Sequence, residues 1–181
     1  MIELRPFEKL GKSDHGWLKA NFHFSFADYR NKDRVHWGNL RVWNNDRIAP
    51  QSGFPPHPHR GFETVTYMLE GHMLHEDHLG NQGHLKTGGV QWMTAGRGII
   101  RSEMPEQEEG LMWGFQLWVN LAAKDKMTKP RYQEIKASEI PEVSRPDGVR
   151  TKVIAGSLDG IAGPINGIGV EPTYLDVTVP K

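Results

Sequence analysis

The side chains best suited to chemistry are two histidines separated by one proline, His57 and His59. In an extended chain, residues two apart project from the same face, so both imidazoles can reach one metal ion. Pro58 favours this conformation, because a proline pushes the residue before it into the extended region. Since proline cannot donate a ladder hydrogen bond, the sequence predicts an edge strand or a bulge here. The simpler interpretation is a pair of exposed strand histidines.

A second candidate group is Arg101 and Glu103, which also lie two residues apart and therefore share a face of an extended strand. Gly96 and Gly98 permit a tight turn just before them, which can bring this face opposite the histidines. The alternative is a surface ion pair, which contributes little to stability.

Further histidines and carboxylates surround a turn predicted at Gly80. They are His72, His75, His78, His84, Glu76 and Asp77. Such a group is compatible with a second metal site, but a solvated hairpin is the favoured interpretation.

The composition limits what these groups can do. The 181 residues contain 22 Lys and Arg against 22 Asp and Glu, and this zero net charge argues against direct binding to nucleic acid. There are no cysteines, so any metal site must use His, Asp or Glu. Residues 1–9 carry charges where a signal peptide needs an apolar run, and no later stretch is long and apolar enough to cross a membrane. We expect a soluble, cytoplasmic protein.

The hydrophobic pattern has a period of two, which is typical of half-buried strands. The strands are predicted at Leu18–Phe26, Gly38–Trp43, Gly61–Leu69, Gly71–His75, Val90–Met93, Ile99–Glu103 and Leu111–Val119. Helix is expected only near Leu121–Met127. Many short strands separated by turn signals favour an all-β antiparallel sandwich or barrel, with Trp92 and Met93 in its core.

The C-terminal part differs in composition. A glycine-rich stretch at Gly156–Gly169 predicts a linker or long loop, and strands are predicted on either side of it at Val149–Ala155 and Thr173–Val179. Unpaired strand edges there would invite further pairing. We therefore expect either a homodimer formed through this tail or a tail packed back on the rest of the chain.

The two motifs His57-Pro-His59-Arg-Gly-Phe-Glu63-Thr-Val and Gln91-Trp-Met-Thr-Ala-Gly96-Arg-Gly98-Ile resemble the signatures of the pirin family in the cupin superfamily. The resemblance covers roughly residues 16–119. It implies a cupin antiparallel β-barrel of the jelly-roll type, the N-terminal barrel of a bicupin, at residues 1–135. Residues 136–181 would then be a linker and the first strands of an incomplete second cupin.

The resemblance also implies a metal site of three histidines and one glutamate, usually holding iron. His57, His59 and Glu103 match that set, but Arg101 stands where the family has its remaining histidine. A guanidinium has no lone pair to offer a metal. Two histidines and one carboxylate are still the composition of the non-haem Fe(II) facial triad. Alternatively, Arg101 pairs with Glu103 and fills the site, so that Fe(II) or another divalent metal binds weakly or not at all.

Two functions follow from this resemblance. The first is a quercetin 2,3-dioxygenase-type oxidoreductase acting on a flavonol, in which Glu103 would serve as metal ligand and base. The second is a catalytically silent pirin that acts as a regulator by contacting a protein partner. We expect Glu63 to lie behind the metal ligands, and Arg60 and Arg97 to face an anionic substrate or, more simply, solvent.

Overall fold

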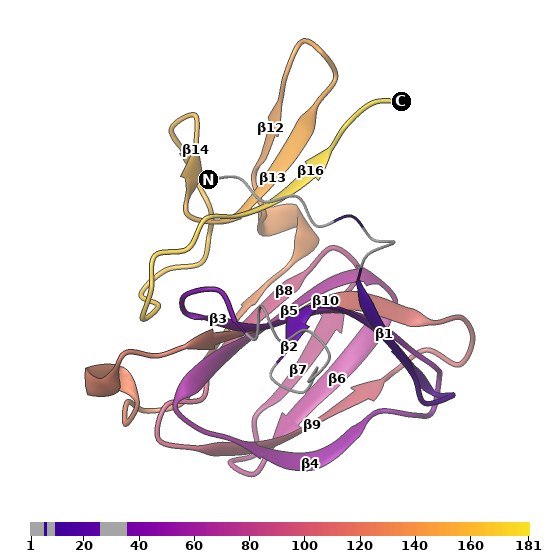
Figure 1. Ribbon diagram of the computed structural model, residues 1–181, viewed down its shortest axis with the longest axis vertical. Coiled ribbons are helices and arrows are strands. Elements are labelled where there is room, and N and C mark those ends of the chain that lie inside the picture. Colours follow the sequence, from indigo (N-terminus) through magenta and orange to yellow (C-terminus); the bar gives the residue numbers. More distant parts are fainter. Residues whose placement is uncertain (1–5, 7–9, 26–35) are drawn as a thin grey trace.

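Two antiparallel sheets face one another in the computed structural model, which describes residue 6 and residues 10–25 and 36–181 (Figure 1). The larger sheet has the order β1 (Gly11–Asp14), β2 (Leu18–Ser25), β3 (Leu40–Ile48), β10 (Met112–Asn120), β5 (Phe62–Glu70), β8 (Val90–Thr94) and β11 (Arg131–Ile135). The smaller sheet has the order β4 (Phe54–His59), β9 (Ile99–Pro105), β6 (His72–Asp77) and β7 (Gln82–Lys86). The prediction of an all-β antiparallel fold is confirmed.

Every strand predicted in the first 120 residues is present, with ends that differ by a few residues. Phe26, the last residue of the first predicted strand, lies outside the described residues. The strand predicted at Gly38–Trp43 begins at Leu40 and continues through a polar stretch to Ile48. β1, β7 and β11, together with β12 (Glu142–Ser144), escaped prediction, since they are short and mostly polar. The predicted helix is a single turn, η2 (Ala123–Asp125).

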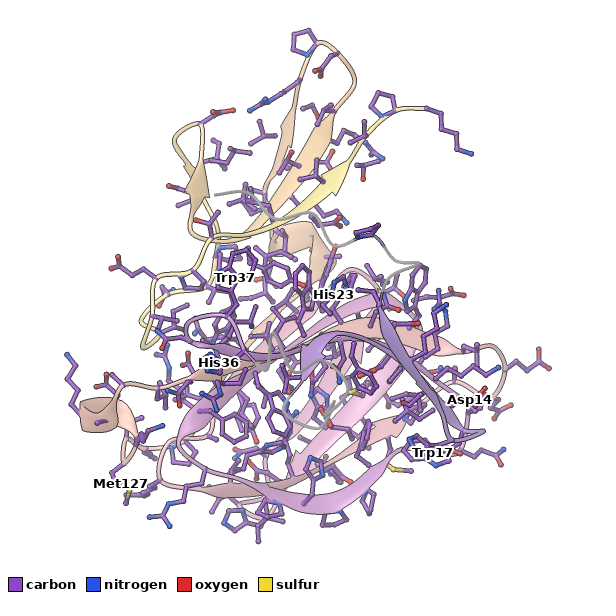
Figure 2. The ribbon with its side chains drawn as sticks, viewed as in Figure 1. Asp14, Trp17, His23, His36, Trp37 and Met127 are labelled. Atoms are coloured by element: carbon purple, nitrogen blue, oxygen red, sulfur yellow. The ribbon has the colours of Figure 1, made fainter. Side chains whose placement is uncertain are left out.

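An apolar core fills the space between the two sheets. Ile48, Met68 and Met112 of the larger sheet pack against Met73 and Leu85 of the smaller sheet. Trp17, labelled in Figure 2, packs against this core, and its indole lies edge-on to the ring of Phe54. No helix in the described part of the chain is long and apolar enough to cross a bilayer.

The C-terminal part folds back on the outer face of the larger sheet. After the single turn η3 (Ala137–Glu139), β12 (Glu142–Ser144), β13 (Arg150–Ala155) and β16 (Tyr174–Thr178) form a three-stranded sheet. Ile140 and Ile154 from this part are buried against Val65, Tyr67 and Trp92 of the larger sheet. Of the two arrangements expected for the tail, the packed-back one is present, and a homodimer stays a prediction.

The glycine-rich stretch predicted as a linker or loop is more ordered than expected. It contains a short hairpin of β14 (Ser157–Leu158) and β15 (Ile161–Ala162). Period-two alternation over two residues is too short to be noticed in a sequence. The larger sheet is thus covered on both faces, by the smaller sheet on one side and by the tail on the other. Trp92 and Met93 are buried, as predicted.

Candidate functional site

The site lies where the edge strand β4 pairs with β9. β4 is the outer strand of the smaller sheet, and its register shifts between Phe54 and His57, as the proline-rich sequence predicts. The pairing places His57 opposite Arg101 and His59 opposite Ile99. The two candidate groups of the sequence are therefore brought together by strand pairing.

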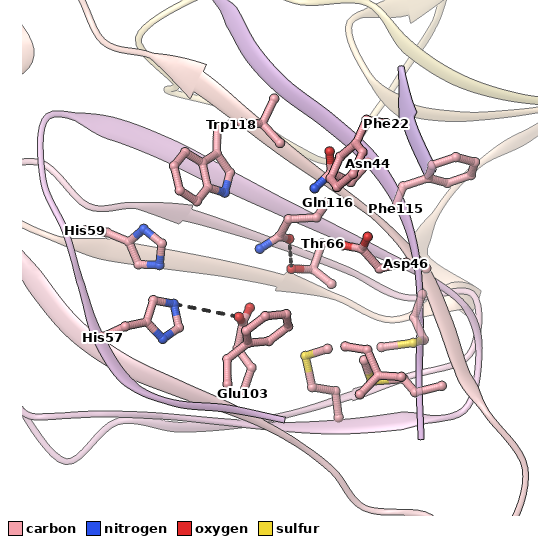
Figure 3. A pocket seen from close by; sticks show the side chains of 17 residues that line it. Phe22, Asn44, Asp46, His57, His59, Thr66, Glu103, Phe115, Gln116 and Trp118 are labelled. Atoms are coloured by element: carbon pink, nitrogen blue, oxygen red, sulfur yellow. Dashed lines mark hydrogen bonds and ion pairs between the residues drawn. The ribbon is translucent and has the colours of Figure 1, made fainter. Parts of the chain in front are cut away.

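His57 stands at the more exposed side of the site, with 32% of its side chain accessible. Its Nδ1 lies 2.8 Å from the carbonyl oxygen of Pro55. Because a carbonyl can only accept, Nδ1 is the donor in this hydrogen bond. The other ring nitrogen, Nε2, lies 4.0 Å from Oε2 of Glu103 (Figure 3).

His59 is buried, and neither of its ring nitrogens has a hydrogen-bond partner among the described residues. Its ring packs edge-on against those of Phe62 and Trp118, with centroids 5.3 and 5.5 Å away. Burial lowers the pKa of His59 to about 3, and the charge of Arg101 adds to this effect. At neutral pH the imidazole is therefore uncharged and able both to donate and to accept a hydrogen bond.

Arg101 and Glu103 form a buried ion pair at the base of the site. Nη2 of Arg101 lies 2.5 Å from Oε1 of Glu103, and the two side chains are 1% and 3% exposed. The guanidinium also donates from Nη1 to Oε1 of Gln91 at 3.4 Å. Burial would raise the pKa of Glu103, but Arg101 and the neighbouring histidines outweigh it and lower the pKa. Glu103 is therefore a carboxylate neutralised by Arg101.

His75 also belongs to this site, which the sequence interpretation of a solvated hairpin missed. It pairs directly with Glu103 across β6 and β9, and its Nε2 lies 3.5 Å from Oε1 of Glu103. The side chain is 3% exposed, and burial lowers its pKa to about 4. The signal was present in the alternation, because His75 shares a strand face with the buried Met73.

The other histidines of the predicted hairpin lie elsewhere. Nδ1 of His84 contacts Oε1 of Glu106 at 2.8 Å with 58% of the side chain exposed, and Nδ1 of His78 accepts from the backbone of Ile100. His72 is exposed. The expectation of a solvated hairpin therefore holds for these three residues and fails only for His75.

Three further predictions concern residues around the site. Glu63 is fully buried, but it faces the tail side of the larger sheet, where its Oε1 accepts a hydrogen bond from Thr94 at 2.7 Å. The prediction that it lies behind the metal ligands is wrong, because Glu63 and the site-facing Thr66 have opposite parity in β5. Arg60 and Arg97 are exposed, and Arg60 contacts the exposed Met127, labelled in Figure 2.

A cavity of about 270 Å³ opens from the site into the space between the sheets. Its walls are mostly apolar and include the aromatic rings of Phe22, Phe54, Phe115 and Trp118. His57, His59 and Glu103 line one side of it (Figure 3). Pockets for drug-sized ligands usually measure about 300 to 1,000 Å³, so this cavity suits a small molecule.

The present arrangement does not fit a divalent metal ion. No three His, Asp or Glu side chains within residues 10–25 and 36–181 are placed so as to hold one. The ring nitrogens of His59 and Nε2 of His57 are atoms of the kind that bind metals, but the carboxylate of Glu103 is already bound by Arg101. A fixed cation at this position also repels a second cation.

Comparison with known proteins places these features in context. The Pirin family model matches residues 3–119. A pirin-like protein of Caulobacter vibrioides is 54% identical over 143 residues, which are 78% of this chain and 52% of the relative. A Pseudomonas aeruginosa protein named "Putative quercetin 2,3-dioxygenase PA3240" is 59% identical over 133 residues, which are 71% of this chain and 47% of the relative. The chain thus spans about half the length of these relatives.

Solved structures agree with the cupin fold. The pirin YhhW of Escherichia coli, solved in complex with nickel(II), has a TM-score of 0.72 at 30% identity, over 86% of this chain and 72% of its own. A quercetin 2,3-dioxygenase of Acinetobacter baumannii has a TM-score of 0.75 at 33% identity, over 86% of this chain and 57% of its own.

Proposed function

The chain belongs to the pirin family, and we propose that its cavity binds a flavonol-like aromatic molecule without a resident divalent metal. The observation that carries this proposal is the buried ion pair of Arg101 and Glu103 in the place where the family resemblance puts a metal. The division of the chain at residue 135, with a linker and the first strands of a second cupin at residues 136–181, is part of the same proposal.

The ion pair opposes metal binding in two ways. It neutralises the only carboxylate of the set that His57, His59 and Glu103 would form. It also places a permanent positive charge in the site, and a divalent ion 4 Å from a unit charge is repelled by about 8 kcal/mol at an effective dielectric constant of about 20. Any Fe(II) or other divalent metal should therefore bind weakly.

The two histidines at the cavity wall suit a hydroxylated aromatic ligand. His59 has two unpartnered ring nitrogens, and Nε2 of His57 can accept a hydrogen bond from a hydroxyl group. A flavonol presents an adjacent hydroxyl and carbonyl, which match one acceptor and one donor. The aromatic walls of the cavity would stack on or edge against its rings. The names of two relatives, which refer to quercetin, point to the same class of ligand.

Oxygenation of the ligand is expected only when the arginine is removed. In the dioxygenase chemistry implied by the resemblance, a metal acts as the Lewis acid for the deprotonated flavonol. We therefore expect the natural chain to bind flavonols without turnover. The second candidate function is a regulator that acts by contacting a protein partner. Such a role does not require a bound metal, and this agrees with the buried ion pair in the site.

The test combines metal content with ligand binding. The natural chain and its Arg101→His variant are loaded anaerobically with Fe(II), desalted and measured by elemental analysis. Quercetin binding is followed by quenching of tryptophan fluorescence, since Trp118 lines the cavity. The Arg101→His variant carrying a further His59→Ala substitution serves as the control for specific metal loading.

We expect less than about a tenth of an equivalent of iron in the natural chain, saturable quercetin binding, and near-stoichiometric iron only in Arg101→His. Stoichiometric iron in the natural chain would overturn the metal-free site. Metal-free protein that does not bind quercetin would overturn the ligand proposal and favour the regulator.

A further inference from the structure

A second polar group lines the cavity, away from the histidines. β3 carries Asn44 and Asp46 two residues apart, so both side chains project from the same face and into the cavity. Figure 3 shows Asp46 on the opposite side of the cavity from His57 and His59. Oδ1 of Asn44 and Oδ1 of Asp46 are buried and have no hydrogen-bond partner among the described residues.

The strands beside β3 explain why Asp46 has no partner. Across β2 its neighbour is Ala20, and across β10 its neighbour is Gly114. Directly opposed residues are the closest side-chain neighbours in an antiparallel sheet. A methyl group and a hydrogen atom cannot donate a hydrogen bond to a carboxylate, so the sheet itself leaves Asp46 unsatisfied.

Asn44 is in a similar position. Its neighbours are Phe22 on β2 and Gln116 on β10, and the amide of Gln116 is already hydrogen-bonded to Oγ1 of Thr66 at 2.7 Å. Most buried polar side-chain atoms in proteins have a partner. The side-chain oxygens of Asn44 and Asp46 lack a partner and face the cavity together, so they can bind a molecule inside it.

The charges around Asp46 indicate which kind of ligand group it can bind. Burial raises the pKa of Asp46 to about 7, and the negative charge of Glu103 adds to this effect. Around neutral pH the group therefore exchanges between a carboxylate and a carboxylic acid. Either form makes a hydrogen bond with a hydroxyl group, whereas an anionic group on the ligand would be repelled by the carboxylate.

We propose that Asn44 and Asp46 form a specificity subsite that binds a phenolic hydroxyl at the end of the ligand remote from His57 and His59. This inference rests on the proposed function, because it assumes that an aromatic ligand occupies the cavity. The pocket then selects flat aromatic molecules hydroxylated at both ends over otherwise identical molecules hydroxylated only at the histidine end.

The experiment uses two ligands that differ by one hydroxyl group, 3-hydroxyflavone and 3,4′-dihydroxyflavone, titrated by calorimetry into the full chain. The variants are Asp46→Leu, Asp46→Asn and the control Asp14→Leu, which removes an exposed carboxylate from the same sheet. Thermal unfolding of each variant establishes that it is folded. The readout is the ratio of the two dissociation constants.

We expect the natural chain and Asp14→Leu to bind the dihydroxylated ligand about tenfold more tightly, the size of one buried hydrogen bond. Asp46→Leu should bind both ligands equally within about twofold, and Asp46→Asn should keep part of the preference. A preference that persists in Asp46→Leu, or that is absent from the natural chain, would overturn the subsite. If neither ligand binds the natural chain, the proposed function fails as well, which separates the two ideas.

Discussion

The buried ion pair of Arg101 and Glu103 leads to a prediction about stability. Each side chain is at least 97% buried, because 1% and 3% remain exposed. Removing one partner of such a pair leaves an uncompensated charge inside the protein and costs about 3–5 kcal/mol of unfolding free energy. Arg101→Met and Glu103→Leu should each show a loss of this size, whereas a surface pair typically contributes less than about 1 kcal/mol.

The double substitution Arg101→Met with Glu103→Leu should behave differently. Replacing a whole buried pair by apolar side chains of similar volume is often neutral or stabilising. The double variant should therefore lie within about 1 kcal/mol of the natural chain, or above it, although each single variant is strongly destabilised. The coupling energy between the two positions should exceed about 3 kcal/mol, the upper end for neighbouring residues.

Urea unfolding of the four proteins measures this cycle, provided that the slopes with denaturant agree. Melting temperatures supply a second measurement, since 1 kcal/mol corresponds to about 2–4 °C for a chain of this size. If the single substitutions cost less than about 1 kcal/mol, or if the double variant loses the sum of the two, the pair is not buried and coupled as described. The reasoning behind the metal-free site would then also be lost.

Three shorter predictions follow. Nickel(II) at about 100 times its dissociation constant should stabilise Arg101→His by about 2.7 kcal/mol, which is measured as a higher melting temperature. The melting temperature of the natural chain should not change, and equal shifts in the two proteins would contradict this prediction. The pKa of Asp46, raised to about 7 from 3.8, means that the folded chain keeps a proton that the unfolded chain has lost, so stability falls as pH rises through this window. In urea unfolding, the free energy of unfolding of Asp46→Asn should therefore exceed that of the natural chain by more at pH 8 than at pH 5. Gly96→Ala should lower the free energy of unfolding by more than about 2 kcal/mol in thermal unfolding. The residue has φ +50°, and a Cβ there would collide with the backbone oxygen of Thr128. The control Gly80→Ala, with open space around it, should lose only about 1 kcal/mol.

Much of the site could be predicted from local spacing. The two-residue separation of His57 and His59, and of Arg101 and Glu103, placed each pair on one strand face. Proline chemistry predicted the edge strand and its irregular register. The resemblance to pirins then related the two pairs to one site. The two face assignments and the edge strand could be predicted because each depends on residues close together in the chain.

Other parts of the site depended on which strands lie side by side. His75 joined the site only because β6 pairs with β9, which places it opposite Glu103. The sequence predicts which residues share a strand face with Glu63. It does not predict which face of the larger sheet packs against the tail. Asp46 lacks a hydrogen-bond partner because its neighbours in two distant strands are Ala20 and Gly114, and no local pattern contains that information.

By itself the sequence determined the all-β class and the residues that share a strand face, and its resemblance to pirins implied that Arg101 stands at the position of a histidine ligand. Whether Arg101 would point into solvent, avoid the site or occupy it was decided only by the tertiary structure. The guanidinium is enclosed between the sheets with one nitrogen 2.5 Å from Glu103. Alternation along a strand is a property of the backbone and can be predicted from neighbouring residues. The burial of a charge depends instead on the side chains that distant strands bring around it, and these are set by the strand order of the whole fold.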